Sequence, residues 1–444
     1  MSLPRYPAYK DSGVEWLGEV PGHWTFASLK RGYGVVLGKM LQNDASSPDD
    51  ELVPYLRAAN IKWNGVDISD VKQMWVSPRE INQLALSAGD LLISEGGDVG
   101  RSAIWQNELE ACYFQNSVNR ARSKNGNSTR YLYYWISAIK DIGFIDIICN
   151  KSTIAHFTAE KVAAVPMPFP PPKEQQTIAA FLDRETGKID ALIAEQRRLA
   201  ELLAEKRQAV ISHAVTKGLN PSARMKDSGI EWLGEVPEHW EIKPIKAIAT
   251  CNDEVLEEST PKDYEIEYIE ISGVDASRGI ASTDLVLFGD APSRARRRLK
   301  DGDVLVSTVR TYLRAIAPVS NPPENMIAST GFAVIRPRHV TSHFLGYLFQ
   351  AEFLISEVIA HSVGVSYPAI NASELMRLNV PIPLPVEQTT ISAFLDTETA
   401  KFDTLTAEAN RAIALLQERR SALISAAVTG KIDIRKLSLK KEAA

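Results

Sequence analysis

The densest cluster of cations in this 444-residue chain is Arg294–Lys300, which reads RARRRLK and places five cations in seven residues. The surrounding segment, residues 290–338, contains nine Arg or Lys and four Asp or Glu, a local charge of +5 in a chain of net charge −5. Because salt screens exposed charges separated by more than ~8 Å, this local excess decides which partner the segment attracts. The pattern predicts a surface that faces phosphate groups, and the alternative is a solvated basic strand edge or helix face.

Motifs that could support catalysis are incomplete. Residues 321–323 read NPP, the start of the N-P-P-aromatic motif of adenine methyltransferases, but Glu324 replaces the ring that would hold a flipped base. Gly38 and Lys39 match the end of a phosphate-binding loop, but Tyr33 stands where its first glycine is needed and Met40 where its Ser or Thr is needed. We therefore expect no catalytic residues.

Histidines and cysteines show no metal-ligand spacing. Cys112, Cys149 and Cys251 lie far apart without a C-x-x-C pair, so we expect buried thiols in a reducing compartment. His23 and His239 each precede a tryptophan and are predicted to be packed turn residues. No apolar run approaches the ~20 residues that span a bilayer, and no signal pattern is visible. We expect a cytoplasmic protein with no membrane partner, metal or cofactor.

Two pairs of similar segments reveal an internal duplication. Lys10–Trp24 and Lys226–Trp240 are identical at thirteen of fifteen positions, and Thr177–Asp190 and Thr390–Asp403 at ten of fourteen. The order along the chain is therefore A, B, A′, B′, with two long, divergent stretches between the matched blocks. A shared frame with divergent inserts suits one molecule that recognises two different things.

Each B segment predicts a long helix. Glu174–Val215 and Glu387–Val428 contain almost no Gly or Pro, and each follows a proline-rich stretch that should be extended, 166–172 and 381–385. Apolar residues recur there at heptad spacing: Leu182, Ile189, Leu203 and Val210, then Leu395, Phe402, Leu416 and Leu423. The second seam positions are predicted to be Leu192, Leu199 and Leu405. Such stripes need a partner, so we expect an antiparallel pair of rods of ~60 Å; the alternative is that each helix packs on its own domain.

The divergent stretches are predicted to mix strands and helices. Short apolar runs such as Gly89–Ser94 lie between turn residues and predict strands, whereas Tyr131–Lys140 predicts a helix. The A-B-A′-B′ order also predicts a pseudo-twofold internal repeat, in which the first repeated block lies at the end of the second rod. The chain termini should then be close together.

These motifs resemble the specificity subunit of type I restriction-modification enzymes. The marks are the KDSG-EWLGEVP-HW block, the P-x-P stretch followed by EQ, the AFLD-x-ET-x-K-x-D helix start, and the AVT ends at 214–216 and 427–429. The resemblance implies α/β (α+β) target-recognition domains in two copies, separated by a long antiparallel two-helix coiled coil. It implies a non-catalytic subunit that binds double-stranded DNA and holds two methyltransferase subunits and, through them, restriction subunits. The expected boundaries are recognition domain 1 at 1–167, helical spacer 1 at 168–219, recognition domain 2 at 220–380, helical spacer 2 at 381–435 and a tail at 436–444.

Equivalent loops with different side chains are where we expect DNA sequence to be read. Residues 89–94 (GDLLIS) align with 302–307 (GDVLVS), so the loops 95–101 and 308–314 correspond. Two further loop pairs are 114–120 with 329–336, and 151–157 with 363–370. Side chains there that could contact DNA are Asp98, Arg101, Gln115, Asn116, Asn119, His156, Thr308, Arg310, Tyr312, Arg314, Ser366 and Tyr367.

Other candidates lie outside these loops. They are Arg57, Asn60 and Lys62, with Arg294, Arg296, Arg297, Arg298 and Lys300 as clamps on the DNA backbone. For any one candidate, the alternative to a base contact is a loop residue satisfied within the protein or a phosphate contact.

A duplicated, non-enzymatic scaffold for protein partners, with incidental DNA contact, is the alternative function. Trp16 and Trp232 would serve it as docking anchors for the helix ends or for a partner. The different recognition loops favour DNA reading, because a symmetric scaffold would not need them.

Overall fold

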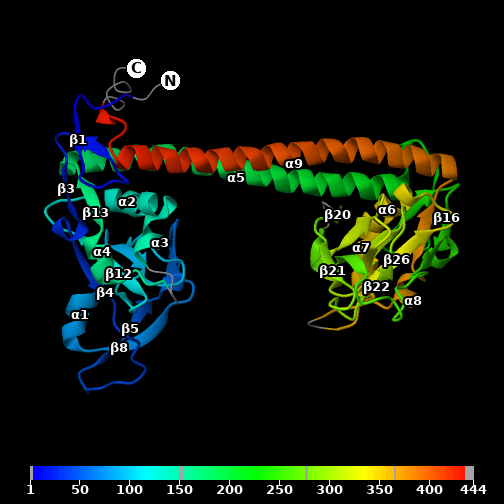
Figure 1. Cartoon of the computed structure of the whole chain (residues 1–444), viewed down its shortest axis with the longest axis horizontal. Coiled ribbons are helices and arrows are strands. Elements are labelled where there is room, and N and C mark those ends of the chain that lie inside the picture. Colours follow the sequence, from blue (N-terminus) through cyan, green and yellow to red (C-terminus); the bar gives the residue numbers. More distant parts are fainter. Residues whose placement is uncertain (1–3, 150–154, 276–278, 365–366, 436–444) are drawn as a thin grey trace. The chain divides into compact units, whose positions relative to one another are not determined.

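The computed structural model describes residues 4–149, 155–275, 279–364 and 367–435. The chain divides into two compact units, Met1–Gln196 with Arg411–Ala444, and Arg197–Asn410. Each unit contains one lobe of strands and short helices together with one half of each long helix, α5 (Pro172–Lys217) and α9 (Pro385–Val428) (Figure 1). Within the described residues, no helix is both long and apolar enough to cross a membrane.

The first lobe is built on two larger sheets, beside which the described residues form three two-stranded sheets, β1-β2, β13-β3 and β6-β7. One has the antiparallel order β10-β9-β12-β4, and the other has the order β11-β5-β8, in which β11 and β5 are parallel. Its strands are β1 (Tyr9–Asp11), β2 (Glu19–Pro21), β3 (Thr25–Ser28), β4 (Tyr33–Leu37), β5 (Glu51–Leu56), β6 (Ile61–Lys62), β7 (Gly65–Val66), β8 (Lys72–Val76), β9 (Leu91–Ser94), β10 (Ser102–Ile104), β11 (Tyr113–Phe114), β12 (Val118–Ser123) and β13 (Pro166–Phe169). Its helices are α1 (Pro78–Leu84), α2 (Thr129–Asp141), α3 (Phe144–Ile148) and α4 (Ala159–Ala164).

The second lobe repeats this plan. Its two larger sheets have the orders β17-β26-β23-β24 and β21-β18-β25-β22, and its two-stranded sheets in the described residues are β14-β15, β16-β27 and β19-β20. Its strands are β14 (Met225–Asp227), β15 (Glu235–Pro237), β16 (Glu241–Pro244), β17 (Ala249–Cys251), β18 (Glu265–Ile269), β19 (Val274–Asp275), β20 (Gly279–Ile280), β21 (Asp284–Leu287), β22 (Ala295–Arg298), β23 (Val304–Ser307), β24 (Ile316–Pro318), β25 (Met326–Ser329), β26 (Phe332–Pro337) and β27 (Asn379–Ile382). Its helices are α6 (Ser342–Gln350), α7 (Glu352–Ala360) and α8 (Ala372–Leu375).

The aligned apolar runs form equivalent central strands, as the sequence predicted. In β9, Leu91 and Ile93 belong to the core that contains α2, whereas Leu92 belongs to the core under the second sheet. In β23, Val304 and Val306 belong to one core, and Leu305 belongs to the core on the other face of the strand. A strand buried on both faces reads as a continuous apolar run, which explains why these segments do not alternate with polar residues.

The proline-rich stretches end inside the first turn of each long helix. β13 and β27 are extended, as predicted, but α5 already begins at Pro172 and α9 at Pro385. Proline suits the first helical position because its missing N–H would have no helical partner there. The following glutamines explain the motif: the Gln175 side-chain amide donates to the Pro170 carbonyl and Gln388 to that of Pro383, each at 2.9 Å.

The prediction for the second helical seam is wrong. Leu192, Leu199 and Leu405 are 46%, 44% and 47% exposed. The buried positions lie four residues after the first seam instead, as Ile193 follows Ile189. In a heptad, the second seam position can lie either three or four residues after the first. The leucines lie at the three-residue step, which faces solvent here.

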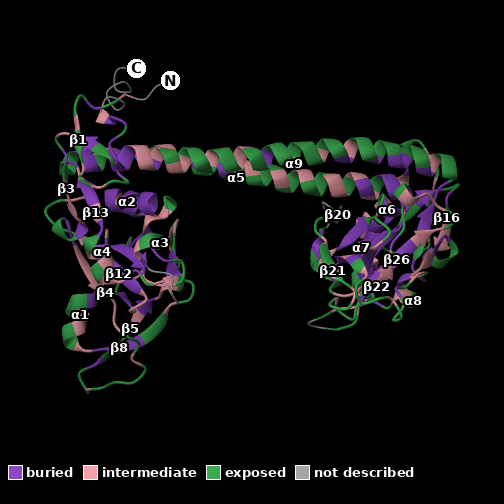
Figure 2. Cartoon of the chain, viewed as in Figure 1, coloured by how far each residue is buried: buried purple, intermediate pink, exposed green. Residues whose placement is uncertain are grey.

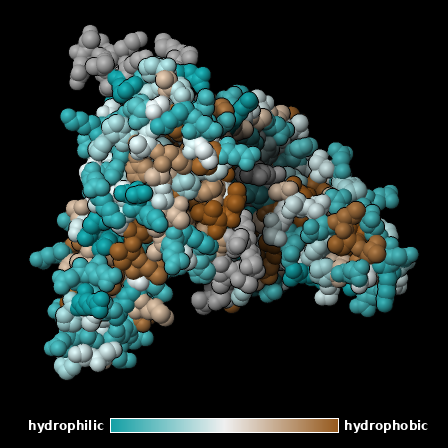
Figure 3. All heavy atoms as spheres, turned by 60° about the vertical axis from the view of Figure 1, so that its left-hand side comes forward, coloured by the Kyte–Doolittle hydropathy of each residue, from teal (hydrophilic) through white to brown (hydrophobic). Residues whose placement is uncertain are grey.

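Within each unit the two helix halves lie side by side and are joined by an ion pair. Arg420 contacts Asp190 at 2.8 Å in the first unit, and Arg207 contacts Asp403 at 3.1 Å in the second. In Figure 2, buried residues gather in the sheets, while the long helices are mostly exposed. The face shown in Figure 3 is mainly hydrophilic, with several separate hydrophobic areas.

The first repeated block holds the end of α9, which confirms its predicted place at the end of the second long helix. The Asp433 amide donates to the Pro4 carbonyl at 2.7 Å, and the Tyr9 hydroxyl donates to the Gly430 carbonyl at 3.1 Å. The second block holds the end of α5 in the same way, since Leu233, Val236 and Trp240 share a core with Ile211 and Val215. The repeat is therefore a connector between a lobe and two helix ends.

Candidate nucleic-acid interface

Four loops of the first unit meet at one end of the β9 strand. An Arg101 guanidinium nitrogen donates to the Ala58 carbonyl at 2.9 Å, and the Ala58 amide donates to the Ser117 hydroxyl at 3.1 Å. The Glu95 amide donates to the Ser117 carbonyl at 2.9 Å, and the Phe157 amide to that of Glu95 at 2.8 Å. The candidates Arg57, Arg101, Gln115, Asn116 and His156 therefore belong to neighbouring loops.

Several of these first-unit candidates already have partners. Arg57 pairs with Asp70, Asp98 accepts from Lys140 at 2.7 Å, and His156 lies 3.8 Å from Glu95. Gln115 and Asn116 are half-buried, and Lys62 is exposed.

Asn60 and Asn119 have structural positions. Asn60 is 3% exposed, and its side-chain amide donates to the Asp67 carbonyl at 2.8 Å. Asn119 is fully buried in β12 and donates to the Phe157 carbonyl at 2.7 Å. Neither side chain offers its amide to a partner outside the protein, so their role is to hold the loops.

In the second unit, the predicted residues Arg310 and Tyr367 come together from two loops. The Arg310 amide donates to the Pro368 carbonyl at 2.7 Å, and its guanidinium carbon lies 4.8 Å from the Tyr367 ring centroid. The Ile370 amide donates to the Thr308 carbonyl at 2.9 Å, which joins the same two loops. Tyr312 and Tyr367 are 52% and 66% exposed, and Arg310 is exposed. Ser366 lies outside the described residues.

Arg310 and Arg314 both adopt the left-handed backbone conformation, with φ of 51° and 53°. Ile93 of β9 and Val306 of β23 are equivalent positions. Ser102 pairs with Ile93 and Ile316 pairs with Val306, so Ser102 and Ile316 are also equivalent. Counting from the strands, the corresponding left-handed positions of the first unit are Gly97 and Gly100. The second copy thus holds arginines where the first uses glycines.

This register corrects two alignments made from the sequence. Arg101 corresponds to Ala315, not to Arg314, because the second loop is one residue longer. Similarly, Arg336 corresponds to Arg122, since each pairs with the acid that precedes its central strand, Asp303 at 2.8 Å and Asp90 at 2.6 Å. Hydrogen bonds to Asp303 raise the pKa of Arg336, so this pair is a fixed brace.

Arg314 makes a two-pronged contact with Glu352, at 2.7 and 2.9 Å. Leu313, which the sequence analysis did not select, is 46% exposed in the same loop. Leu313 was not selected because an apolar side chain makes no hydrogen bond to a base. Its position between Tyr312 and Arg314 could have indicated it.

The basic run forms the edge strand β22 and the residues beside it, which matches the strand-edge alternative. Arg294 pairs with Glu270, Arg296 lies 5.0 Å from the Phe288 ring centroid, and Lys300 pairs with Glu254. Among the described residues, Arg297 and Arg298 make no ion pair. Their half-buried guanidinium groups remain candidates for a phosphate contact.

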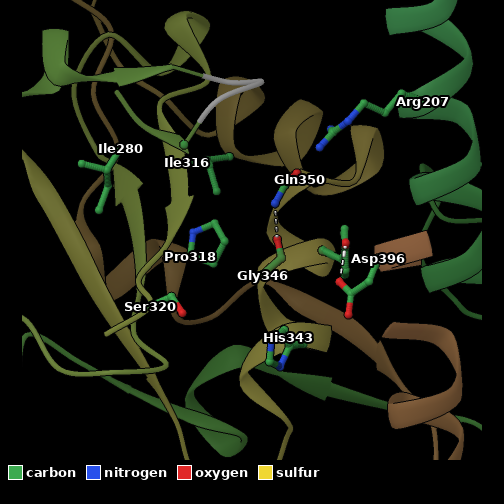
Figure 4. Close-up of a pocket in the computed structure, with 11 residues that line it drawn as sticks. Arg207, Ile280, Ile316, Pro318, Ser320, His343, Gly346, Gln350 and Asp396 are labelled. Atoms are coloured by element: carbon green, nitrogen blue, oxygen red, sulfur yellow. Dashed lines mark hydrogen bonds between the residues drawn. The ribbon is translucent and has the colours of Figure 1, made fainter. Parts of the chain in front are cut away.

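The pocket drawn in Figure 4 joins the second lobe to the long helices. It has a volume of about 380 Å³ and is lined by Arg207 of α5, His343 and Gln350 of α6, and Asp396 of α9. The Tyr347 hydroxyl donates to Asp396 at 2.7 Å, and in the first unit the Tyr134 hydroxyl donates to Asp183 at 2.6 Å. In both copies these polar groups hydrogen-bond to one another. We therefore assign the residues of this pocket a structural role, which is to join the lobe to the long helices.

The described part of the chain offers no evident metal site. There, no group of three or more His, Cys, Asp or Glu side chains could hold an ion.

The two exposed tryptophans of the repeated blocks have different surroundings. Trp16 packs near Phe144 with ring centroids 4.8 Å apart, whereas Trp232 is 62% exposed.

A family model for the type I restriction modification DNA specificity domain matches residues 38–202 and 237–414, more than half of the chain. The chain belongs to this family. Its two matches fall on the two copies of the duplicated plan, so each unit carries one DNA specificity domain.

Relatives of this specificity subunit are similar over nearly their full length. The putative type I restriction enzyme MjaX specificity subunit of Methanocaldococcus jannaschii is 22% identical, over 94% of this chain and 96% of the relative. The StySPI specificity subunit of Salmonella potsdam is 21% identical, over 94% and 90%. A solved chain from work on complex assembly and conformational transition of a type I R-M system has a TM-score of 0.68 at 14% identity, over 92% of this chain and 98% of that one.

These findings confirm the predicted family and the predicted role as a DNA specificity subunit. They also support a subunit that is not itself an enzyme, because the relatives are specificity subunits of restriction enzymes. The fold similarity extends to both mixed lobes.

Proposed function

We propose that each lobe of this specificity subunit reads one half of a bipartite, asymmetric DNA target. The readers are the exposed loops after β9 in the first unit and after β23 in the second. In the second unit, Arg310 would donate to a guanine edge, with Tyr367 and Tyr312 beside it, while Arg297 and Arg298 would contact phosphates.

The observation that carries this proposal is the left-handed backbone at Arg310. A non-glycine residue in this conformation costs ~1–2 kcal/mol, and glycine occupies the corresponding position of the first unit. Retaining an exposed, strained arginine there is understandable when its side chain must project toward a ligand. The aromatic ring of Tyr367, 4.8 Å away, fixes the guanidinium plane.

The long helices α5 and α9 would be the frame that carries both lobes. The paired halves of α5 and α9 would form an antiparallel coiled coil that sets the gap between the two half-sites. Two methyltransferase subunits would dock on this frame, and restriction subunits would join through them. The division into recognition domains at 1–167 and 220–380, with spacers at 168–219 and 381–435, belongs to this proposal, as does a location in the cytoplasm, where such a complex would meet DNA.

A fluorescence titration tests DNA binding directly. The subunit, with its methyltransferase partner, is titrated with random duplex DNA at about 50 mM and about 200 mM salt. We expect affinity to fall by at least about tenfold, because each phosphate contact releases counterions. An affinity that does not change with salt would contradict the proposal.

A further inference from the structure

In the first unit, the segment after α9 covers the beginning of α5. Gly430 turns the chain at φ 76°, and the amides of Lys431 and Ile432 then donate to the Ala426 carbonyl at 2.9 and 3.3 Å. Ile432 and Ile434 are 5% and 1% exposed and share one core with Phe181 of α5. The C-terminal segment is therefore part of the packing at this helix end.

Among the described residues of the second unit, no separate segment takes this place. At the corresponding place, α5 leads directly into the connection to the second repeated block. Gly218, with φ of 74°, lies beside Trp240 and Pro237 as Gly430 lies beside Trp24 and Pro21, and Leu219 follows it. Leu219 is 37% exposed. On α9, Phe394 corresponds to Phe181 and is 39% exposed, compared with 9% for Phe181. The duplication therefore left one helix stripe uncovered in the second copy.

The uncovered stripe forms one wall of a groove of about 820 Å³. Its apolar lining includes Val210, Ala214, Leu219, Met225 and Phe394. Its polar lining includes the cations Lys206 and Lys217, with His213 and a single carboxylate, Glu235, to which Lys217 is already tied through the backbone carbonyl. An occupant of this groove should accordingly be apolar and carry a negative charge.

We propose that this groove binds an extended segment of a partner protein, with two branched aliphatic side chains on either side of a carboxylate. The chain itself supplies the two aliphatic side chains of this pattern, because Ile432 and Ile434 are buried at the corresponding helix end of the first unit. The residue between them, Asp433, pairs there with Arg435 of the same segment, whereas the second unit offers lysines. The groove cations would receive the carboxylate of the partner segment. A second copy of the chain is a poorer occupant, since its own segment is already buried and its release would expose two isoleucines, each worth ~1.5–3 kcal/mol.

A labelled peptide tests the groove on the full-length protein. The probe is fluorescein-GSIDISG-amide, which keeps the Ile-Asp-Ile pattern of residues 432–434 and omits the cations Lys431 and Arg435. We expect a saturable rise in anisotropy, and we expect Phe394→Ser to weaken the affinity by at least about tenfold. Leu405→Ser, an equally exposed change on the same helix outside the groove lining, should leave the affinity unchanged. Because Phe394 is 39% exposed, both variants should keep the melting temperature of the parent.

Control peptides and cross-linking decide between the possible occupants. A peptide with both isoleucines replaced by serine should not bind, and replacement of its aspartate by asparagine should weaken binding and reduce its salt dependence. A photoreactive residue at the second isoleucine should label residues 206–225 or Phe394.

Three outcomes would overturn the proposal. The first is undiminished binding to Phe394→Ser, or no binding even at millimolar peptide. The second is cross-linking to residues 172–182 or 419–428, which would mean that the probe only displaces the chain's own segment. The third is a dimer in sedimentation that Phe394→Ser dissociates, which would identify a second copy as the occupant.

Discussion

The indole nitrogen of Trp24 donates to a carboxylate oxygen of Glu174 at 3.1 Å, which ties the first repeated block to the first turn of α5. Glu174 also accepts from the Tyr6 hydroxyl at 2.7 Å and lies 2.8 Å from the His23 ring nitrogen. In the second unit, Glu387 accepts from Trp240 at 3.0 Å and contacts His239 at 2.9 Å. The nearly identical blocks thus have one task, which is to fasten a lobe to a helix.

Replacing Glu174 with alanine should lower the free energy of unfolding by ~2–4 kcal/mol, because buried donors would lose their acceptor. Glu387→Ala is the matched control and should cost less, ~1–2 kcal/mol, since the Glu387 side chain is 28% exposed, compared with 7% for Glu174. Urea denaturation followed by tryptophan fluorescence measures both changes. Equal losses would contradict the view that the deeper burial of Glu174 makes its hydrogen bonds worth more than those of Glu387.

Arg310→Ala and Arg297→Ala should affect DNA binding differently. Loss of Arg310 should remove ~1–3 kcal/mol of discrimination at one base position. Loss of Arg297 should weaken all sequences alike and reduce the salt slope by about one. Selection from a library of duplexes, followed by sequencing, measures both, and equal effects on specificity would refute the division between readers and clamps.

Arg310→Gly separates binding from stability. Glycine tolerates the positive φ, so thermal stability should be unchanged or higher by up to ~1 kcal/mol, while specific DNA binding falls. Arg298→Gly, in the strand β22, should instead cost ~1 kcal/mol, because glycine weakens a strand. A clear loss of stability in Arg310→Gly would show that the arginine braces the loop and does not serve a ligand.

An insertion tests the spacer. Four residues added after Arg197 in α5, and four after Ile413 in α9, lie between the ion pairs Asp190–Arg420 and Arg207–Asp403, so both pairs can persist. The added rise of ~6 Å should lengthen the gap between half-sites by about one to two base pairs without changing either half. Mapping of methylated adenines by the assembled complex measures the gap. An unaltered gap would mean that the helices do not set the spacing.

Thiol chemistry should be slow in the native protein. Burial raises the pKa of Cys112 to about 12 and that of Cys251 to about 11, and it also raises the pKa of Cys149. At pH 8 the thiolate fraction of Cys251 is then about a hundredfold below that of a free cysteine, so alkylation should be slower by a similar factor. Iodoacetamide labelling with and without urea compares the two states. Cys251 is half-buried, and rapid native labelling of it would contradict its raised pKa.

The sequence by itself determined the duplication, the two long helices and the strands that are buried on both faces. These features depend on local patterns: near-identity of two blocks, absence of Gly and Pro, and continuous apolar runs between turns. The place of the first repeated block at the end of the second long helix followed from the order of the blocks together with the expected pairing of the helices.

Tertiary structure decided which helix face is buried and which loop residues are exposed. Leu192 and Ile193 are both plausible seam residues, and only the position of the partner helix selects Ile193. Asn119 and Arg310 are both of residue types that can read bases, but Asn119 is buried in a paired strand, whereas Arg310 is exposed in a loop. Heptad and loop patterns restrict the candidates, whereas burial depends on contacts between residues far apart in the chain, which no local pattern encodes.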